Sequence, residues 1–228
     1  MANPLPNPPA PVRDWRFDEP DTTNNGDPNL VAYDSVGMLN GSLEAVTRVA
    51  PRVPTGAVHL DGSNAACVNF PAQVAQFGTA DFTVSFWINT TDKSLDLCDL
   101  VGNRLVAGHG NFFCIRMQKS GLVSAEVDQD ANGTNYINVV SNASVNNGSW
   151  HNVAVVRRST TLTIYIDGVN PVSATGRGVA NLNNGNFLKI GRSANTGDVR
   201  FAPVATYDEL RIWNVALTAD QVLSSLNT

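Results

Sequence analysis

Apolar and polar residues alternate along several short segments of the chain, and turn residues follow most of these segments. In "DFTVSFWINT" (residues 81–90), Phe, Val, Phe and Ile fall on one face, while Thr, Ser, Trp and Asn fall on the other. A repeat of two is the side-chain period of a β-strand that has one face in a core. The same pattern elsewhere completes the set of predicted inward residues: Phe82, Val84, Phe86, Ile88, Val153, Val155, Leu162, Ile164, Ile166, Leu188, Ile190, Leu210 and Ile212.

A helical repeat is found only near the end of the chain. In "LTADQVLSSL", Thr218 is a suitable N-cap, and Val222, Leu223 and Leu226 follow at helical spacing. The remaining chain alternates strand-like runs with Gly, Asn and Asp turns, as a β-sandwich does. The sequence therefore predicts an all-β fold of two antiparallel sheets with one short C-terminal helix.

The first eleven residues, "MANPLPNPPAP", differ from the remainder because five of them are proline. Such a segment favours extended polyproline geometry and has little to pack, so we expect residues 1–11 to be a tail or linker. The segment has no apolar stretch that could serve as a secretory signal. Residues 12–228 are expected to form one domain, since 228 residues suit a single sandwich.

Charge and hydropathy exclude several classes of partner. The formal net charge is -5, and Lys and Arg are scattered along the chain, so we expect neither nucleic-acid nor anionic-membrane binding. No run of 18 apolar residues is present, so no membrane span is expected. None of His59, His109 and His151 lies in a nucleophile motif.

Three cysteines are present, Cys67, Cys98 and Cys114, without the spacing of a zinc site. Cys98 in "LDLCDLV" and Cys114 in "NFFCIRM" are joined by the glycine-containing segment "GNRLVAGHG". A hairpin between these two runs would bring the cysteines across from each other. A disulfide between Cys98 and Cys114 is one hypothesis, and two free thiols on paired strands are the alternative.

The segment "SAEVDQD" places three carboxylates, Glu126, Asp128 and Asp130, on one face of a strand. Two carboxylates can cleave a glycosidic bond, and spacing alone does not exclude Glu126 and Asp128 from that role. However, if a hairpin closes at "KSG", Arg116 lies close enough to pair with Glu126. The neighbours in "DQDANGT" are polar and would not raise the pKa of a catalytic acid. We therefore expect a solvated, noncatalytic strand face.

Seven blocks follow one another along the chain: "WRFDEP", "YDSVGMLNGSL", "AVHLDGSNAACVNF", "DFTVSFWINT", "GSWHNVAVVRRSTTLTIYIDG", "LKIGRSA" and "YDELRIWNVALTADQV". In this order they resemble the laminin-G-like, concanavalin-A-like jelly-roll family, which includes pentraxins and sugar-binding modules of secreted bacterial proteins. The resemblance covers nearly everything after residue 12. It implies a jelly-roll sandwich with ligands bound on the concave face or at the loop rim. Most members bind glycans or proteins without catalysis, although related folds include β-glucanases.

The resemblance also implies particular residue roles. In the glucanase branch, Glu-x-Asp on the catalytic strand is followed by a second Glu, which this chain lacks after Asp128. Related jelly rolls commonly hold a structural calcium ion, and the matching positions are Asp18, the backbone carbonyl of Gly62, and Asp208. Calcium suits such a set because it prefers several hard oxygen ligands. The alternative is that both aspartates are turn or edge residues with hydrogen-bonding roles.

A glycan-binding surface needs an aromatic platform among polar groups. Trp87 and Tyr165 lie on the predicted outward strand faces, and Trp213 lies near Arg211. These three are the candidate ligand-binding residues, and the alternative is that they pack beneath loops or the terminal helix.

Our first hypothesis is a noncatalytic, calcium-stabilised module that binds a glycan or a glycosylated protein. We expect it to be extracellular or on a cell surface, with its leader absent from this chain, and an oligomer remains open. The alternatives are a protein-interaction or structural adhesion domain without sugar affinity, and a β-glucan hydrolase that uses Glu126 and Asp128.

Overall fold

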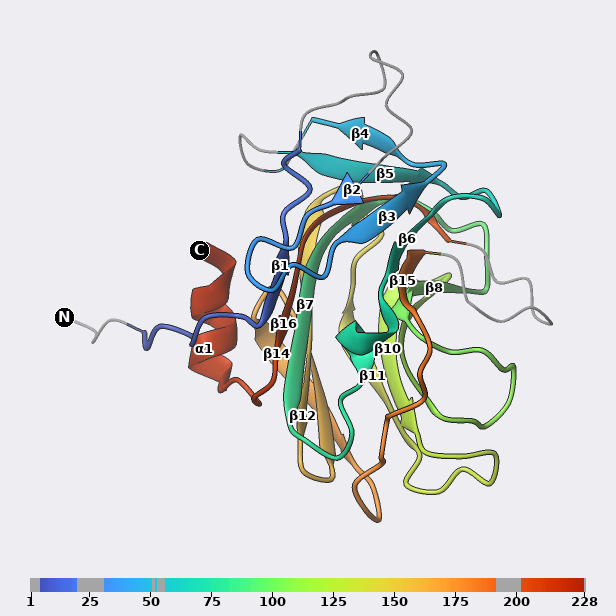
Figure 1. Cartoon of the computed structure of the whole chain (residues 1–228), viewed down its shortest axis with the longest axis vertical. Helices are drawn as coiled ribbons and strands as arrows, with labels where there is room; N and C mark the ends of the chain where they lie inside the picture. The colour runs from blue at the N-terminus through green and yellow to red at the C-terminus, as the bar shows by residue number, and fades with distance from the viewer. Residues whose placement is uncertain (1–4, 20–30, 51, 53–55, 192–201, 228) are drawn as a thin grey trace.

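Two antiparallel sheets of eight strands each face one another in the computed structural model, which describes residues 5–19, 31–50, 52, 56–191 and 202–227 (Figure 1). The strands are β1 (Arg13–Trp15), β2 (Val31–Ala32), β3 (Gly41–Glu44), β4 (Thr47–Val49), β5 (Ala57–Asp61), β6 (Cys67–Phe70), β7 (Phe82–Thr90), β8 (Leu97–Gly102), β9 (Phe112–Gln118), β10 (Leu122–Asp128), β11 (Ile137–Ser144), β12 (Trp150–Arg158), β13 (Thr161–Ile166), β14 (Val169–Thr175), β15 (Leu188–Gly191) and β16 (Val204–Trp213). The helical elements are α1 (Ala219–Ser224) and the 3-10 turns η2 (Ala72–Ala75) and η3 (Ser225–Asn227).

The strand order of both sheets confirms the predicted sandwich. Sheet A runs β14-β13-β12-β7-β16-β5-β4, and β1 also pairs with β16. Sheet B runs β11-β10-β9-β8-β15-β6-β3-β2. Local chemistry closes the hairpins: Asp167 and Gly168, with φ of 56° and 71°, form the turn between β13 and β14. Neighbouring strands in these sheets often lie far apart in sequence, as in a jelly roll.

The core lies between the two sheets and contains every predicted inward residue. Phe82 of sheet A and Phe113 of sheet B pack edge to face across it, with 5.3 Å between ring centroids. Burying a large apolar side chain contributes about 1.5–3 kcal/mol, so alternation along many strands supplies most of the driving force for this arrangement.

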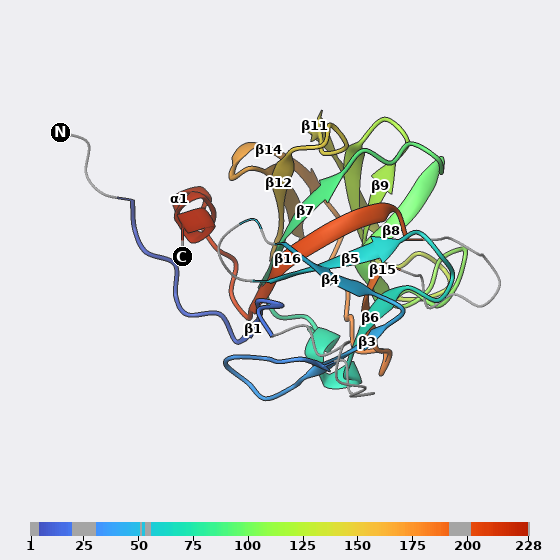
Figure 2. The ribbon, with the colours of Figure 1, turned by 90° about the horizontal axis from the view of Figure 1, so that it is seen from above.

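Helix α1 lies on the outer face of sheet A (Figure 2). Its N-cap is Thr218, as predicted, and Gln221 completes a capping box. Val222 packs with Tyr165 and Trp213 in a small second apolar cluster, so this outer face is covered instead of exposed. Because the helix supplies apolar cover, outward residues of sheet A are also buried there.

Residues 5–11 lie along the domain, beside α1 and the end of β16. The indole Nε1 of Trp213 donates a hydrogen bond to the Pro9 carbonyl at 2.8 Å. The Ser224 hydroxyl donates to the Pro6 carbonyl at 2.9 Å. This segment therefore has packing partners in the domain, and its expected role as a tail or linker stays a prediction.

The predicted disulfide between Cys98 and Cys114 is wrong. Strands β8 and β9 pair as expected, but Cys98 stands opposite Met117 and Cys114 opposite Gly102. Cys98 lies within the core, whereas Cys114 lies on the other face of sheet B, and both are free thiols. Two side chains on opposite faces of a sheet cannot meet the geometry of a disulfide.

No helix within the described ranges is long and apolar enough to cross a membrane.

Candidate functional site

The acidic strand face of β10 is covered, so the expectation of a solvated face is wrong for two of its three carboxylates. Glu126 is 6% exposed and Asp128 is 0% exposed, whereas Asp130 is partly exposed. The cover is the loop between β8 and β9, residues 103–111, which folds over the outer face of sheet B. Strand alternation assigns a residue to a face, but it does not reveal which loop crosses that face.

Arg104 holds this loop in place over the strand. Its guanidinium donates to the carbonyls of Val106, Ala107 and Gly108, at 2.7, 2.5 and 2.9 Å. The guanidinium carbon also lies 4.2 Å from the centroid of the Phe112 ring, in a cation–π contact. One buried arginine thus ties the backbone of its own loop to the outer face of sheet B.

Both carboxylate oxygens of Glu126 accept hydrogen bonds. Arg116 donates to Oε1 at 3.2 Å, which confirms the predicted cross-strand pair. Arg104 and the Tyr136 hydroxyl each donate to Oε2 at 3.1 Å. Burial and the neighbouring Glu126 raise the pKa of Tyr136 to about 12, so its hydroxyl remains a donor near neutral pH. Glu126 therefore fixes the position of the Tyr136 ring.

Asp128 fixes a second ring, that of His109 in the covering loop. Nδ1 of His109 lies 2.7 Å from Oδ2 of Asp128, which also accepts a hydrogen bond from the Gly110 amide at 3.3 Å. The Gln129 amide donates to Oδ1 at 2.9 Å. The His109 ring packs edge-on against Tyr136, with 5.0 Å between centroids. Neighbouring carboxylates on β10 thus position two rings that touch each other.

The third carboxylate shapes the turn that follows β10. Oδ1 of Asp130 accepts hydrogen bonds from the amides of Asn132 and Thr134, at 2.9 and 3.2 Å. Gly133 in this turn has a φ of 71°, and a Cβ atom there would lie 2.8 Å from the His109 ring. Glycine is required here both for backbone conformation and for close approach to the ring.

The rings of His109 and Tyr136, together with Gly133, line a polar cavity of about 420 Å³, which we call the rim pocket. It lies where the loop between β8 and β9, the turn after β10 and the end of β14 meet. Its lining residues are His109, Asn132, Gly133, Asn135, Tyr136, Thr175, Gly176 and Arg177. Sequence reasoning missed this site. The available signal was the set of short glycine-containing polar segments "GHG", "NGT" and "GRG", which are remote from one another in sequence.

The three aromatic residues predicted to bind a ligand do not come together. Tyr165 and Trp213 are buried beneath α1, 8% and 2% exposed, as the alternative interpretation expected. Trp87 is half-buried, and the Arg52 guanidinium carbon lies 3.8 Å from its ring centroid. A ligand role for any of the three stays a prediction, and their positions do not form one platform.

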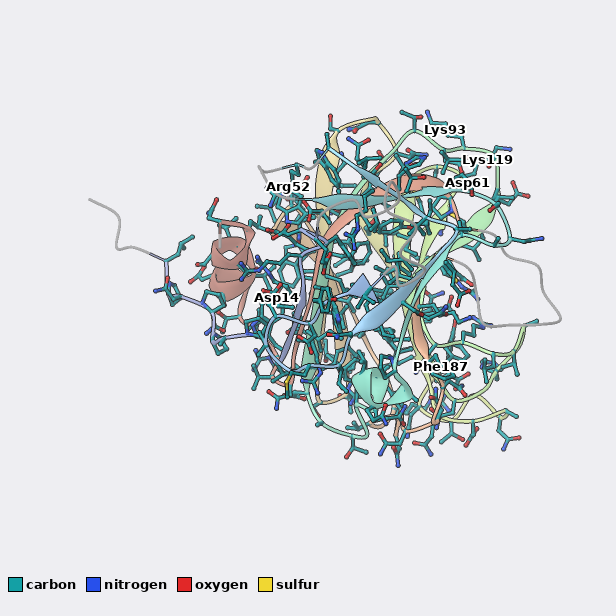
Figure 3. All side chains as sticks on the ribbon, turned by 45° about the horizontal axis from the view of Figure 1, so that its top comes forward. Asp14, Arg52, Asp61, Lys93, Lys119 and Phe187 are labelled. Atoms are coloured by element: carbon teal, nitrogen blue, oxygen red, sulfur yellow. The ribbon has the colours of Figure 1, made fainter. Side chains whose placement is uncertain are left out.

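The predicted calcium ligands fall into two places. Asp18 accepts a hydrogen bond from the Gly56 amide at 3.0 Å, just before β5, and its charge acts on Asp208. Gly62 lies beside Val204, beyond the other end of β5. Figure 3 shows the separation, because its labels for Arg52, near the start of β5, and Asp61, at its end, stand well apart. The predicted set of three is therefore not brought together.

Asp208 is a buried carboxylate of an unusual kind. It is 0% exposed, and neither oxygen has a hydrogen-bond partner among the described residues. Burial, followed by the charges of Glu209 and Asp18, raises its pKa to about 7, and Arg52 partly opposes this. The strand bulges directly after it, where Glu209 has a φ of 49°. Among the described residues, no group of three or more His, Cys, Asp or Glu side chains surrounds one point.

Known structures resemble this chain along nearly its whole length. The binding domain of Paraclostridial Mosquitocidal Protein 1 superposes with a TM-score of 0.74 and 17% identity, covering 95% of this chain and 52% of that one. The botulinum neurotoxin serotype G binding domain gives 0.68 and 14%, covering 95% and 50%. Our chain thus spans about half the length of these toxin domains. Domain 4 of AbnA, a GH43 extracellular arabinanase from Geobacillus stearothermophilus solved with arabinotriose, gives 0.67 and 18%, covering 96% and 98%.

Comparison with known sequences identifies the family of this chain. No curated protein sequence matches the chain significantly. The sequence profile described as "Concanavalin A-like lectin/glucanases superfamily" (Laminin_G_3) matches residues 61–223, well over half of the chain. With its two-sheet jelly roll, the chain belongs to the concanavalin A-like lectin/glucanase superfamily.

Proposed function

We propose that this chain is a noncatalytic carbohydrate-binding module that holds a sugar in the rim pocket. The observation that carries the proposal is a polar cavity of about 420 Å³ whose two rings are each held by a buried carboxylate. Such a cavity is within the usual size range of ligand pockets. A sugar needs donors and acceptors for its hydroxyls and ring surface for its C–H groups, and the rim pocket supplies these. The arabinotriose complex of the similar arabinanase domain supports the choice of ligand class.

The polar groups in the pocket are available to a ligand. Arg177 is exposed and offers only donors, and Asn132 is exposed and offers both donors and an acceptor. The side-chain nitrogen of Asn135 donates hydrogen bonds to Gln129 and to the Val179 carbonyl, and its Oδ1 is the acceptor that it can offer to a ligand. A hydroxyl can therefore find both kinds of partner within one small cavity.

The contacts of Glu126 support a noncatalytic role. Glycoside hydrolysis requires one carboxyl group that donates a proton and a second that attacks the sugar or activates water. Here both oxygens of Glu126 accept hydrogen bonds from arginines and Tyr136, and the loop of residues 103–111 lies over it. Glu126 is therefore engaged in holding its neighbours and is shielded from a substrate.

Binding is tested by calorimetry with arabinotriose and by a glycan array at pH 7.5. We expect Arg177→Ala and Asn132→Ala to weaken sugar binding about tenfold, since each removes hydrogen bonds to the ligand. Asn142→Ala is the matched control, because Asn142 is exposed on β11 outside the pocket lining. Absence of binding to every sugar would leave the protein-interaction domain as the better description.

Catalysis is tested separately by incubating the protein with β-glucans and arabinans and measuring new reducing ends. We expect none above background. Release that disappears in Glu126→Gln would establish the hydrolase instead.

We further propose that calcium binds at Asp208 and stabilises the fold. Two buried carboxylate oxygens without hydrogen bonds fit a cation, and Asp18 adds a second carboxylate nearby. The backbone carbonyl of Phe17, next to Asp18 in the chain, packs closely against Gly56, where a Cβ would lie 2.1 Å from its oxygen. Calcium accepts such carbonyl ligands and would neutralise the buried charge. Gly62 is too remote to take part.

The calcium proposal is tested by thermal unfolding in calcium and in EDTA. A ligand at 100 times its dissociation constant stabilises by about 2.7 kcal/mol, or roughly 5–10 °C for a chain of this size. Asp208→Asn should abolish the shift, and Asp61→Asn, at the exposed end of β5, should keep it. Equal melting temperatures in calcium and EDTA would contradict the proposal. Extracellular location and oligomeric state stay predictions.

A further inference from the structure

The proton on the His109 ring has a defined place. Asp128 is fully buried, and each of its carboxyl oxygens accepts a hydrogen bond from a backbone amide, Oδ2 from Gly110 and Oδ1 from Gln129. Because Oδ2 already acts as an acceptor, the Nδ1 atom 2.7 Å away is the donor of this pair and carries the hydrogen. In the neutral ring, Nε2 is then a bare acceptor.

The Nε2 edge of the ring faces away from the buried carboxylate. About half of the His109 side chain is exposed, and the ring lines the rim pocket. No described residue makes a hydrogen bond to Nε2, and Gly133 and Tyr136 pack against the ring and hold its orientation. The pocket therefore contains an oriented acceptor without a protein partner.

We propose that a ligand hydroxyl donates its hydrogen bond to Nε2 of His109, so that the pocket selects sugars with a hydroxyl at this position and releases them on acidification. The proposal rests on the sugar-binding function proposed above. Arg177 can only donate, and Tyr136 already donates its proton to Glu126. A hydroxyl that accepts from Arg177 needs an acceptor for its own proton, and Nε2 provides one. Protonation of the ring converts Nε2 into a donor and removes that acceptor.

Charged groups from each neighbouring element act on this ring. They are Asp128 on β10, Asp130 in the following turn, Arg104 in the same loop and Arg177 after β14. The pKa of Asp130 is lowered. Hydrogen bonds from Thr134 are the main cause, and the charge of His109 adds to this effect. The lining contains one histidine, the residue type that gains a proton on mild acidification, whereas the pKa of Tyr136 is raised to about 12. Acidification thus acts on the pocket through His109.

The first test needs no ligand. Nitrogen-15 NMR of the imidazole at pH 7.5 should show the hydrogen on Nδ1 and none on Nε2 of His109. The opposite tautomer would overturn the inference. Asp128→Asn is the comparison, because an amide in this place can donate to Nδ1 and so allows the other tautomer.

The second test measures arabinotriose affinity, or that of the best sugar from the array, between pH 8 and pH 5. We expect the affinity of the wild type for the sugar to fall about tenfold on acidification. This change corresponds to the loss of one hydrogen bond to the ligand. His109→Gln, which keeps an acceptor but cannot titrate in this range, should bind with little pH dependence. A flat wild-type profile, or an unchanged slope in His109→Gln, would overturn the inference while the sugar-binding proposal stands. Failure of the wild type to bind any sugar at pH 7.5 would remove both.

Discussion

Two fully buried aspartates, one on each sheet, have opposite surroundings. Asp128 of sheet B accepts hydrogen bonds from two backbone amides and from His109. Asp208 of sheet A has no hydrogen-bond partner among the described residues, and its pKa is raised to about 7. Both side chains are 0% exposed, so burial alone does not distinguish them.

The two aspartates differ in the hydrogen-bond donors that surround each carboxyl group. The protein provides all the donors that Asp128 needs, so this carboxylate can act as a fixed support for the rim pocket. Asp208 is buried without such donors, which costs free energy unless a proton or a cation joins it. A buried carboxylate with a complete set of donors indicates a structural role, and one without donors indicates a place for something else to bind.

The largest expected effect comes from removing the supported carboxylate. Asp128→Ala should lower the free energy of unfolding by about 3 kcal/mol, because three donors lose their acceptor in a buried place. Urea unfolding at pH 7.5 measures this loss. Asp128→Asn retains an oxygen acceptor and should cost clearly less. If Asp128→Ala is as stable as the wild type, Asp128 does not hold the pocket.

A smaller effect is expected at Asp208 in EDTA. There the ionisable carboxyl group lowers the free energy of unfolding as pH rises, so its removal should help stability instead of reducing it. Its pKa is raised from 3.8 to about 7 in the folded state, so the folded protein binds the proton more tightly than the unfolded chain. This contribution to stability is therefore present at low pH and is lost as pH rises through about 7. Between pH 5 and pH 8 the wild type should lose about 2 kcal/mol relative to Asp208→Asn. Parallel pH profiles for the two proteins would contradict this.

The smallest expected effect concerns the ring held by Glu126. Tyr136→Phe removes one hydrogen bond but leaves both arginines on the carboxylate, so it should cost about 1 kcal/mol in urea unfolding. Tyr33→Phe is the control, because Tyr33 is 56% exposed. Sugar binding by Tyr136→Phe should weaken severalfold as the ring loses its anchor. Full affinity would show that the anchor is dispensable.

Much of the fold could be predicted because its signals are local. The alternation in β7, the Asp167–Gly168 turn and the Thr218 cap each lie within a few residues, and each has the predicted structure. The disulfide prediction failed because it required the register between β8 and β9. That register places Cys98 opposite Met117 and Cys114 opposite Gly102, and alternation within each strand does not encode it.

The rim pocket could not be predicted in the same way. Arg116 and Glu126 were expected to pair because one hairpin joins them. Arg104 and Tyr136 also contact Glu126, but they arrive from separate loops. The same holds for His109 on Asp128, since the path of a loop depends on its packing against the finished sheet.

The amino-acid sequence by itself determined which side chains face the core, where the short helix begins, and that β10 carries three carboxylates on one face. Those features follow from backbone period and capping, which act over a few residues. Only the tertiary structure decided that two of the carboxylates are buried, that one holds His109, and that Asp208 has no hydrogen-bond partner among the described residues. The physical reason is that burial and hydrogen bonding depend on segments distant in sequence, which meet only when the two sheets have packed.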